Sequence, residues 1–232
     1  MFSKKPKTQT GPTCGPYAIA NGLYLTNYIQ KNQINPFVLQ TVQTLFQKNQ
    51  SYVGEIFSSE IMQQTIHDMI YNQPLKIVKK EIRALKPTQL ENDLLQLQPN
   101  EFALLPIQWG DNLHWIGVIH QYGKLKYYNN HTRSLLTFKT VKMFPKVHNA
   151  TNVAFYWQPW ITHKIKKNKY TLNALARIGK HKPMLQLINQ HLAEIDIQKL
   201  NGKTVKINQI HYFLIKQKSK KEVTTWSTMK NI

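Results

Sequence analysis

The sequence predicts an α+β fold, in which a helical first part is followed by an antiparallel sheet. Apolar residues recur every three or four positions over residues 37–46 and 56–70, which is the spacing of one helix face. Residues 101–108 and 114–119 instead form short apolar runs typical of strands, and Tyr122-Gly123-Lys124 supplies the turn of a hairpin. Helices followed by adjacent antiparallel strands indicate layers packed around one core.

Local start and stop signals predict the other elements. Glycines and prolines in residues 11–16 force a turn, from which a helix begins at Cys14. We expect Asn35-Pro36 to begin the next helix and Gly54-Glu55 the third. Farther along we expect a strand or loop at 75–85, a short helix at 87–97, strands at 125–127, 135–141 and 153–157, helices at 172–178 and 184–195, and an apolar run at 205–215.

Cys14 is the only cysteine of the chain and lies at the expected start of the first helix. The helix dipole favours an anion at this end and lowers the pKa of a thiol there. A backbone N–H at the same end, with a glutamine side chain a few residues upstream, can hold a developing oxyanion. Cys14 is therefore interpreted either as a nucleophilic thiolate or as a buried, inert cysteine.

A histidine and two asparagines occupy the ends of the predicted hairpin. His114 begins one strand, and Asn129 or Asn130 ends the next. These ends meet in an antiparallel pair, so an asparagine amide there can accept from one imidazole nitrogen while the other faces a thiol. Asn129 is preferred because it shares strand parity with Leu125 and Tyr127, the apolar face expected toward the core. A shift of one residue would select Asn130.

These motifs resemble a known enzyme family. Cys14-Gly15-Pro16 at a helix start, His114-Trp115 at a strand start and Asn129 at the end of the next strand resemble the papain-like cysteine peptidases. The N-terminal part is similar to bacteriocin-processing peptidases, and residues 106–108 before His114-Trp115 resemble ubiquitin-like-protein proteases and deubiquitinases. Those proteases carry the histidine before the cysteine, whereas here the cysteine comes first, as in papain. The similarity covers residues 9–132.

The resemblance implies a papain-like cysteine protease fold, with an N-terminal helical lobe packed on an antiparallel sheet. It implies that Cys14 is the nucleophile, that His114 is the general base and later the acid, and that Asn129 orients the imidazole. Gln9 is the implied oxyanion-hole donor. The thiolate would attack a carbonyl carbon, and a water molecule assisted by the imidazole would release the acyl-enzyme.

Two residues of the loop before the histidine, Trp109 and Asp111, either line the expected cleft or take part in ordinary loop packing and solvation. We expect no metal centre, since His114 and His120 are separated by about 20 Å along one strand. A single cysteine also excludes the multi-cysteine zinc motifs. The sequence contains no P-loop or dinucleotide fingerprint, so no cofactor is expected.

The chain is strongly basic, with 31 Lys and Arg against 11 Asp and Glu and a net charge of +20. Residues 161–232 hold 15 Lys or Arg against three acidic residues, which gives +12. We therefore expect a catalytic domain at 1–160 and a small, basic, helical C-terminal appendage at 161–232. Basic clusters at 164–169, 177–182 and 216–221 indicate either a solvated face or a surface for nucleic acid, acidic lipid headgroups or an acidic protein.

The favoured function is a thiol hydrolase that cuts a peptide or isopeptide bond in a protein or peptide substrate. The His-Trp block makes ubiquitin or a ubiquitin-like modifier the expected substrate, in a bacterial effector or a viral protease. An acyltransferase, transglutaminase or deamidase would use the same thiolate. The alternative from another class is a basic nucleic-acid-binding protein on a catalytically silent papain-like fold.

The composition also bears on location. No stretch approaches the ~20 apolar residues of a membrane span, and residues 1–7 do not resemble a secretory signal. One cysteine precludes an intramolecular disulfide, and a reactive thiol suits a reducing compartment. We expect a soluble protein of the cytoplasm, or one delivered into a host cytoplasm.

Overall fold

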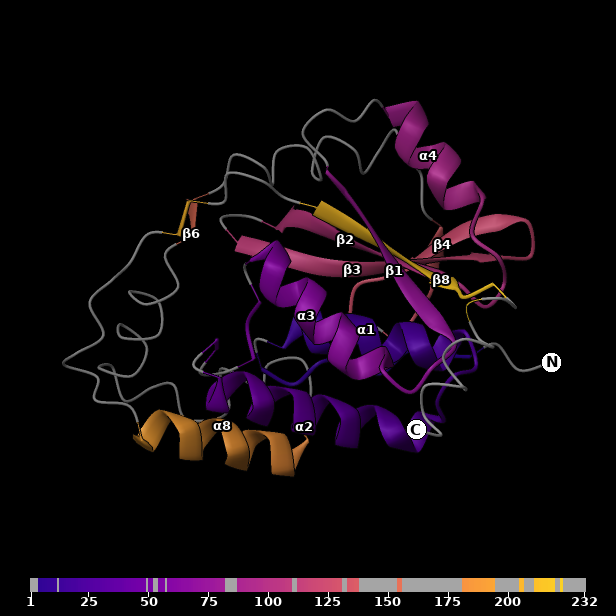
Figure 1. Cartoon of the computed structure of the whole chain (residues 1–232). Helices are drawn as coiled ribbons and strands as arrows, with labels where there is room; N and C mark the ends of the chain where they lie inside the picture. Colours follow the sequence, from indigo (N-terminus) through magenta and orange to yellow (C-terminus); the bar gives the residue numbers. More distant parts are fainter. Residues whose placement is uncertain are drawn as a thin grey trace.

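A six-stranded sheet with helices on both faces forms the centre of the molecule (Figure 1). The computed structural model describes residues 4–11, 13–48, 50–51, 54–56, 58–81, 87–109, 112–130, 133–137, 154–155, 181–194, 205–206, 211–219 and 222. The strand order is β1-β8-β2-β3-β4-β5, and all neighbouring strands are antiparallel. The strands are β1 (Leu75–Glu81), β2 (Phe102–Trp109), β3 (Asn112–Gln121), β4 (Lys124–Tyr128), β5 (Leu136–Thr137) and β8 (His211–Gln217). The combination of helices and an antiparallel sheet confirms the α+β class.

Helices cover the two faces of the sheet unequally. Figure 1 shows α1, α2 and α3 on one side and α4 on the other. Of the first group, α1 packs on β2 and β3, α3 packs on β1, and α2 packs on α1 and α3. The helices are α1 (Cys14–Leu25), α2 (Ile34–Gln47), α3 (Ser59–Ile70), α4 (Pro87–Leu95) and α8 (Lys182–Glu194), with a short 3-10 helix at Lys31–Gln33. The predicted helices at 37–46 and 87–97 are thus confirmed as α2 and α4.

The third helix begins later than the sequence predicts. Ser58 is its N-cap, and the Ser58 hydroxyl accepts hydrogen bonds from the backbone N–H groups of Glu60 and Ile61. Gly54, where the prediction starts the helix, has φ +91, which is a conformation that glycine adopts without strain. The side-chain cap at Ser58 therefore sets the start of α3.

The approach of α1 to the sheet depends on two glycines. A Cβ on Gly117 of β3 would lie 1.9 Å from Cζ of Tyr128, and a Cβ on Gly22 of α1 would lie 2.4 Å from the ring of Phe102. The Tyr128 hydroxyl crosses the gap and donates to the carbonyl of Ala18 at 2.9 Å. Small residues at these positions let α1 lie close against β3, which places its N-terminus at the start of that strand.

The predicted boundary at residue 160 does not separate two parts of the fold. β8 comes from the expected appendage at 161–232, yet it lies inside the main sheet between β1 and β2. The side chains of Phe213, Leu214 and Ile215 are buried there. Helix α8, predicted at 184–195, packs on α2, where the His191 ring stacks on Phe46 with centroids 3.8 Å apart. The expected appendage therefore contributes to the same core.

Several other elements differ in extent from the predictions. The ambiguous stretch at 75–85 contains strand β1, and the predicted strands at 135–141 and 153–157 contain β5 and β6 (Ala154–Phe155). β6 pairs with β7 (Val205–Lys206) in a small second sheet. The predicted helix at 172–178 and residues 138–150 lie outside the described residues.

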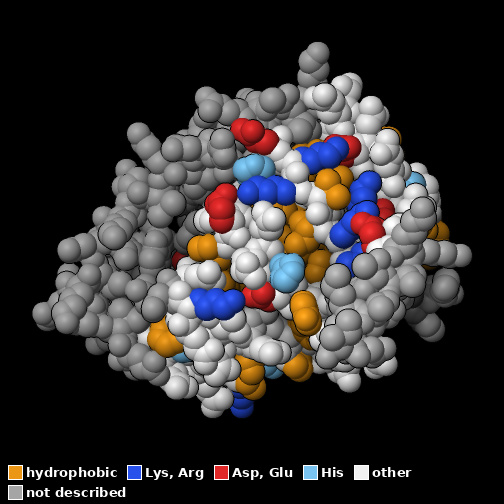
Figure 2. All heavy atoms as spheres, in the orientation of Figure 1, with side chains coloured by type: hydrophobic (Ala, Val, Ile, Leu, Met, Phe, Trp, Pro, Cys, Tyr) orange, Lys and Arg blue, Asp and Glu red, His pale blue; other side chains and the backbone are white. Residues whose placement is uncertain are grey.

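The described surface over α3 and β1 carries charges of both signs (Figure 2). Lysines there form ion pairs with acidic partners: Lys48 with Asp68, Lys76 with Glu222 and Lys79 with Glu60. Within the described part of the chain, no helix is both long and apolar enough to cross a bilayer.

Candidate active site

Cys14 is the first residue of α1, as the sequence predicts. Three backbone N–H groups lie near enough to its thiol to lower the pKa, those of Trp115, Gly15 and Cys14. The last two belong to the first turn of α1, where backbone N–H groups have no partner within the helix. The first comes from β3, one residue after His114. The helix start and the histidine strand therefore meet at the sulfur.

Burial and the helix N-terminus have opposite effects on the pKa of this thiol. Burial and the negative charge of Glu55 raise the pKa of Cys14 to about 11, although the three backbone N–H groups lower it. The net direction is opposite to the one expected from the helix N-terminus alone, because desolvation penalises the thiolate more than the N–H groups favour it. Cys14 nevertheless retains partial solvent exposure. In the resting structure its thiol is protonated at neutral pH.

His114 is held by the end of the next strand. It lies on β3, is 5% exposed, and its Nε2 is 2.7 Å from the backbone carbonyl oxygen of Asn129. A carbonyl oxygen only accepts hydrogen bonds, so Nε2 carries the hydrogen and Nδ1 of the neutral ring is the basic nitrogen. The tautomer of His114 is thereby fixed by the main chain.

The two candidate asparagines lie at the end of β4 as predicted, but their contacts differ from those expected. The hydrogen bond between Asn129 and His114 uses the main-chain carbonyl, whereas the expected contact uses the side-chain amide. Leu125 and Tyr127 are expected on the face toward the core, but Tyr128, of the opposite parity, is the residue that donates to α1. Asn130 shares that parity, and its amide nitrogen lies 3.1 Å from the carbonyl oxygen of Cys14.

Gln9 lies next to Asn130, at the end of β4. Its backbone N–H donates to the carbonyl of Asn130 at 2.7 Å, and its Nε2 donates to the carbonyl of Gly11 at 2.9 Å. The residue is 5% exposed, and its Oε1 is buried without a hydrogen-bond partner among the described residues. One Nε2 hydrogen is occupied by Gly11, and the amide has a second.

The segment 54–56 contributes a residue that the sequence did not single out. Trp115 Nε1 donates to the carbonyl of Ile56 at 2.8 Å, and a Cβ on Gly15 would lie 3.1 Å from the Ile56 side chain. These contacts hold Glu55 beside the first turn of α1, close enough for its charge to raise the pKa of Cys14. The local sequence pattern indicates only a helix start at Gly54-Glu55. The tertiary contacts are what reveal Glu55 as a neighbour of Cys14.

Several other predicted features lie wholly or partly outside the described residues. Trp109 ends β2, and Asp111 lies outside the described residues. The same holds for the basic cluster at 164–169 and for residues 177–180. Among the described residues, no group of three or more His, Cys, Asp or Glu side chains is arranged to hold a metal ion.

The arrangement combines a thiol at a helix start, an imidazole with Nδ1 as its basic nitrogen, and backbone N–H groups pointing at the sulfur. A thiol and a neighbouring base are the parts that nucleophilic catalysis requires. No protein-family model, curated protein sequence or solved structure matches this chain.

Proposed function

We propose that this protein is a cysteine peptidase of papain-like type that hydrolyses a peptide or isopeptide bond. The observation that supports the proposal most is the meeting of the α1 N-terminus with the start of β3, which brings the Cys14 sulfur to the residue that follows His114. Cys14 is the nucleophile and His114 the general base. The carbonyl of Asn129 accepts from the imidazole and orients it.

The reaction begins with transfer of the thiol proton. With a pKa of about 11, very little of the Cys14 thiol is ionised at pH 7, so a base has to take the proton as the sulfur reacts. Nδ1 of His114 is that base. The sulfur then bonds to the substrate carbonyl carbon, and the carbonyl oxygen becomes an oxyanion that backbone N–H groups of the first turn of α1 stabilise.

The imidazolium then returns the proton. It protonates the leaving amine as the C–N bond breaks, which leaves a thioester on Cys14 and a neutral His114. His114 next removes a proton from water, whose oxygen attacks the thioester and releases the acid product and the thiol. Ubiquitin or a ubiquitin-like protein remains the substrate that we propose, on the resemblance of the His114-Trp115 block.

The test is the pH dependence of Cys14 alkylation by iodoacetamide in the wild type and in His114→Ala. We expect the wild type to react at pH 7 at least tenfold faster than His114→Ala, because the variant lacks the base. His120→Ala is the matched control, since His120 lies on the same strand and its Nδ1 is 3.3 Å from the carbonyl of Leu97. His120→Ala should react as the wild type does.

Equal rates in all three proteins, with a midpoint near pH 11, would show that Cys14 is an ordinary buried thiol and would overturn the proposal. A positive result is followed by ubiquitin carrying a thiol-reactive group at its C-terminus, with Cys14→Ser as the unreactive control. Labelling of the wild type alone would support the proposed substrate.

A further inference from the structure

Asn130 is a fully buried polar residue at the point where three segments of the chain meet. Its side-chain Nδ2 donates to the carbonyl of Cys14 at 3.1 Å and to the carbonyl of Trp115 at 3.4 Å. Its Oδ1 accepts from Asn21 Nδ2 of α1 at 2.9 Å, and its main-chain carbonyl accepts from the N–H of Gln9 at 2.7 Å. Asn130 therefore connects the N-terminal segment, α1 and β3.

A second buried asparagine fixes the orientation of this amide. Asn21 Oδ1 accepts from the N–H of Lys7 at 2.8 Å, and Asn21 Nδ2 donates to the Lys7 carbonyl at 2.9 Å as well as to Asn130. With its oxygen accepting from Asn21, the amide of Asn130 directs both hydrogens toward Cys14 and Trp115. Both asparagines are 0% exposed, so each lost bond would leave a buried polar group without a partner.

The register of the sheet explains why an amide is needed there. β4 pairs with β3 only as far as Gly117, opposite Tyr128, so no strand among the described residues covers Trp115 on that side. The carbonyl of Trp115 faces the Asn130 amide, and its N–H faces the Cys14 sulfur. On the other side, Trp115 lies opposite Pro106, which has no N–H to donate. Asn130 and the start of α1 thus replace a strand at this position.

The backbone at Asn130 is also unusual. Its φ is +59, in the left-handed region that asparagine and glycine tolerate better than other residues. This turn at the end of β4 directs the side chain back under β3 and α1. An amide on a residue that accepts this conformation fits the position for both reasons.

We propose that Asn130 is a positioning residue, whose amide holds the first turn of α1 against β3 so that the Cys14 sulfur stays beside Trp115, the residue that follows His114. The inference rests on the proposed function for its catalytic consequence, and on the hydrogen bonds alone for its structural part. It assigns Asn130 to the cysteine, whereas the sequence offered it as an alternative partner of the imidazole.

Two variants test the proposal. Asn130→Gly keeps the left-handed backbone and the bond from Gln9 but removes the amide. Asn130→Asp keeps the size of the side chain and the bond from Asn21, but at pH 7 it lacks both N–H donors. The matched control is Asn27→Gly, because Asn27 also has a positive φ of +72 and its side chain accepts from Lys4 at the surface.

The first measurement is amide hydrogen exchange of Trp115, with Ile116 of the same strand as internal reference. We expect both Asn130 variants to exchange Trp115 at least tenfold faster relative to Ile116, and Asn27→Gly to match the wild type. The second measurement is alkylation of Cys14 at pH 7, which should fall at least fivefold in both Asn130 variants. The rate should then depend little on further substitution of His114 by alanine.

A uniform rise in exchange along β3 would show that Asn130 contributes only to global stability, and would overturn the proposal. An exchange rate of the Trp115 amide equal to that of the wild type in both variants would also overturn the proposal. If the wild type shows no dependence of alkylation on His114, the proposed function fails, while Trp115 exchange still decides whether Asn130 holds α1 against β3.

Discussion

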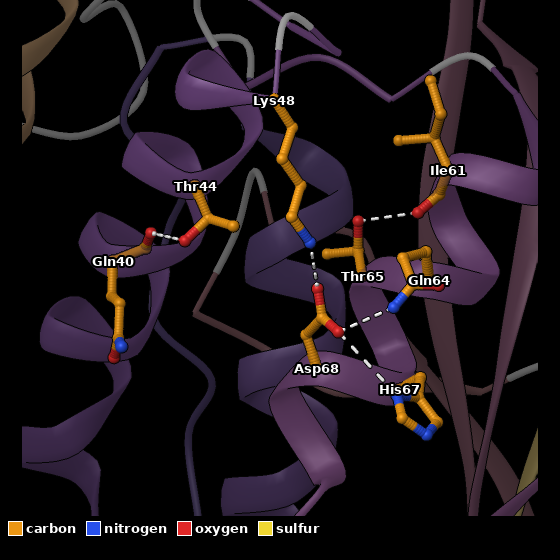
Figure 3. A network of polar contacts seen from close by, with 8 residues as sticks. All are labelled: Gln40, Thr44, Lys48, Ile61, Gln64, Thr65, His67 and Asp68. Carbon is orange, nitrogen blue, oxygen red and sulfur yellow. Dashed lines mark hydrogen bonds and ion pairs between the residues drawn. The ribbon is translucent and has the colours of Figure 1, made fainter.

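Two polar networks of this protein hold helices in place by different means. The seam network joins the side chains of Asn21 and Asn130 to the main chain of Lys7 and to the carbonyls of Cys14 and Trp115. Its two side chains are uncharged amides, and both are fully buried. The outer network, shown in Figure 3, joins α2 to α3 through Lys48, Gln64, His67 and Asp68 at the surface. One network lies at the candidate active site and the other away from it.

Solvent exposure decides what each network contributes. The side chains of Lys48, Asp68 and His67 are 45%, 40% and 61% exposed, and water replaces a broken contact there at little cost. Burial raises the pKa of the Asp68 carboxyl, but hydrogen bonds from Gln64 and Lys48 lower it more, so the net pKa lies below its ordinary value. In the seam network both amide side chains are fully buried, so a lost partner costs about 1–3 kcal/mol for each buried polar group left behind. The seam network therefore fixes the positions of its groups more strongly than the outer network does.

The largest expected effect concerns the close packing of α1 on β3, next to the seam network. Gly117→Ala places a Cβ 1.9 Å from Cζ of the buried Tyr128, so we expect the free energy of unfolding to fall by about 3 kcal/mol or more. Urea denaturation measures it. Gly123→Ala is the control, because no atom lies within 4 Å of its Cβ and only the φ of +67 opposes the substitution, at about 1 kcal/mol. Equal losses in the two variants would contradict this account of the α1–β3 contact.

The next prediction compares the loss of stability when one side-chain amide is removed from each network. Asn21→Ala removes the partner of Asn130 and of the Lys7 main chain, and we expect a loss of about 2 kcal/mol in the free energy of unfolding. Gln64→Ala removes a bond of 2.7 Å to Asp68 at an exposed position, and should cost less than about 0.5 kcal/mol. Both variants introduce alanine into a helix, so helix propensity changes in the same direction. A loss in Gln64→Ala as large as that in Asn21→Ala would remove the distinction between the networks.

The smallest effect depends on pH. Because the pKa of Cys14 is about 11 in the folded protein and about 8.5 in an unfolded chain, the folded state binds more protons between these values. Stability from this group is complete below about pH 8.5 and declines as pH rises toward 11. Cys14→Ser abolishes this titration. Between pH 7 and pH 9 the wild type should lose about 1 kcal/mol more than Cys14→Ser, measured by urea denaturation at each pH. Parallel pH dependence in the two proteins would show that the folded thiol has an ordinary pKa.

Local sequence patterns predicted much of the structure around the seam network. Glycines and prolines before Cys14 indicated the start of α1, and the turn at Tyr122-Gly123-Lys124 indicated the β3–β4 hairpin that brings residues 129–130 back to His114. The position of β8 was not predictable in this way. Its apolar run was visible at 205–215, but pairing with β1, as in Leu75 opposite Gln217, joins residues far apart in the chain and leaves no local pattern.

The sequence by itself determined the helix that begins at Cys14, the strand that carries His114 and the two asparagines at the end of the next strand, because each follows from spacing and turn chemistry. Only the tertiary structure decided which atoms of those asparagines act. Asn129 contributes its carbonyl to His114, and Asn130 contributes its amide to Cys14 and Trp115. The physical reason is that β4 ends two residues before Asn130 and the backbone turns there, so side-chain direction is set by that turn and by the helix packed against it.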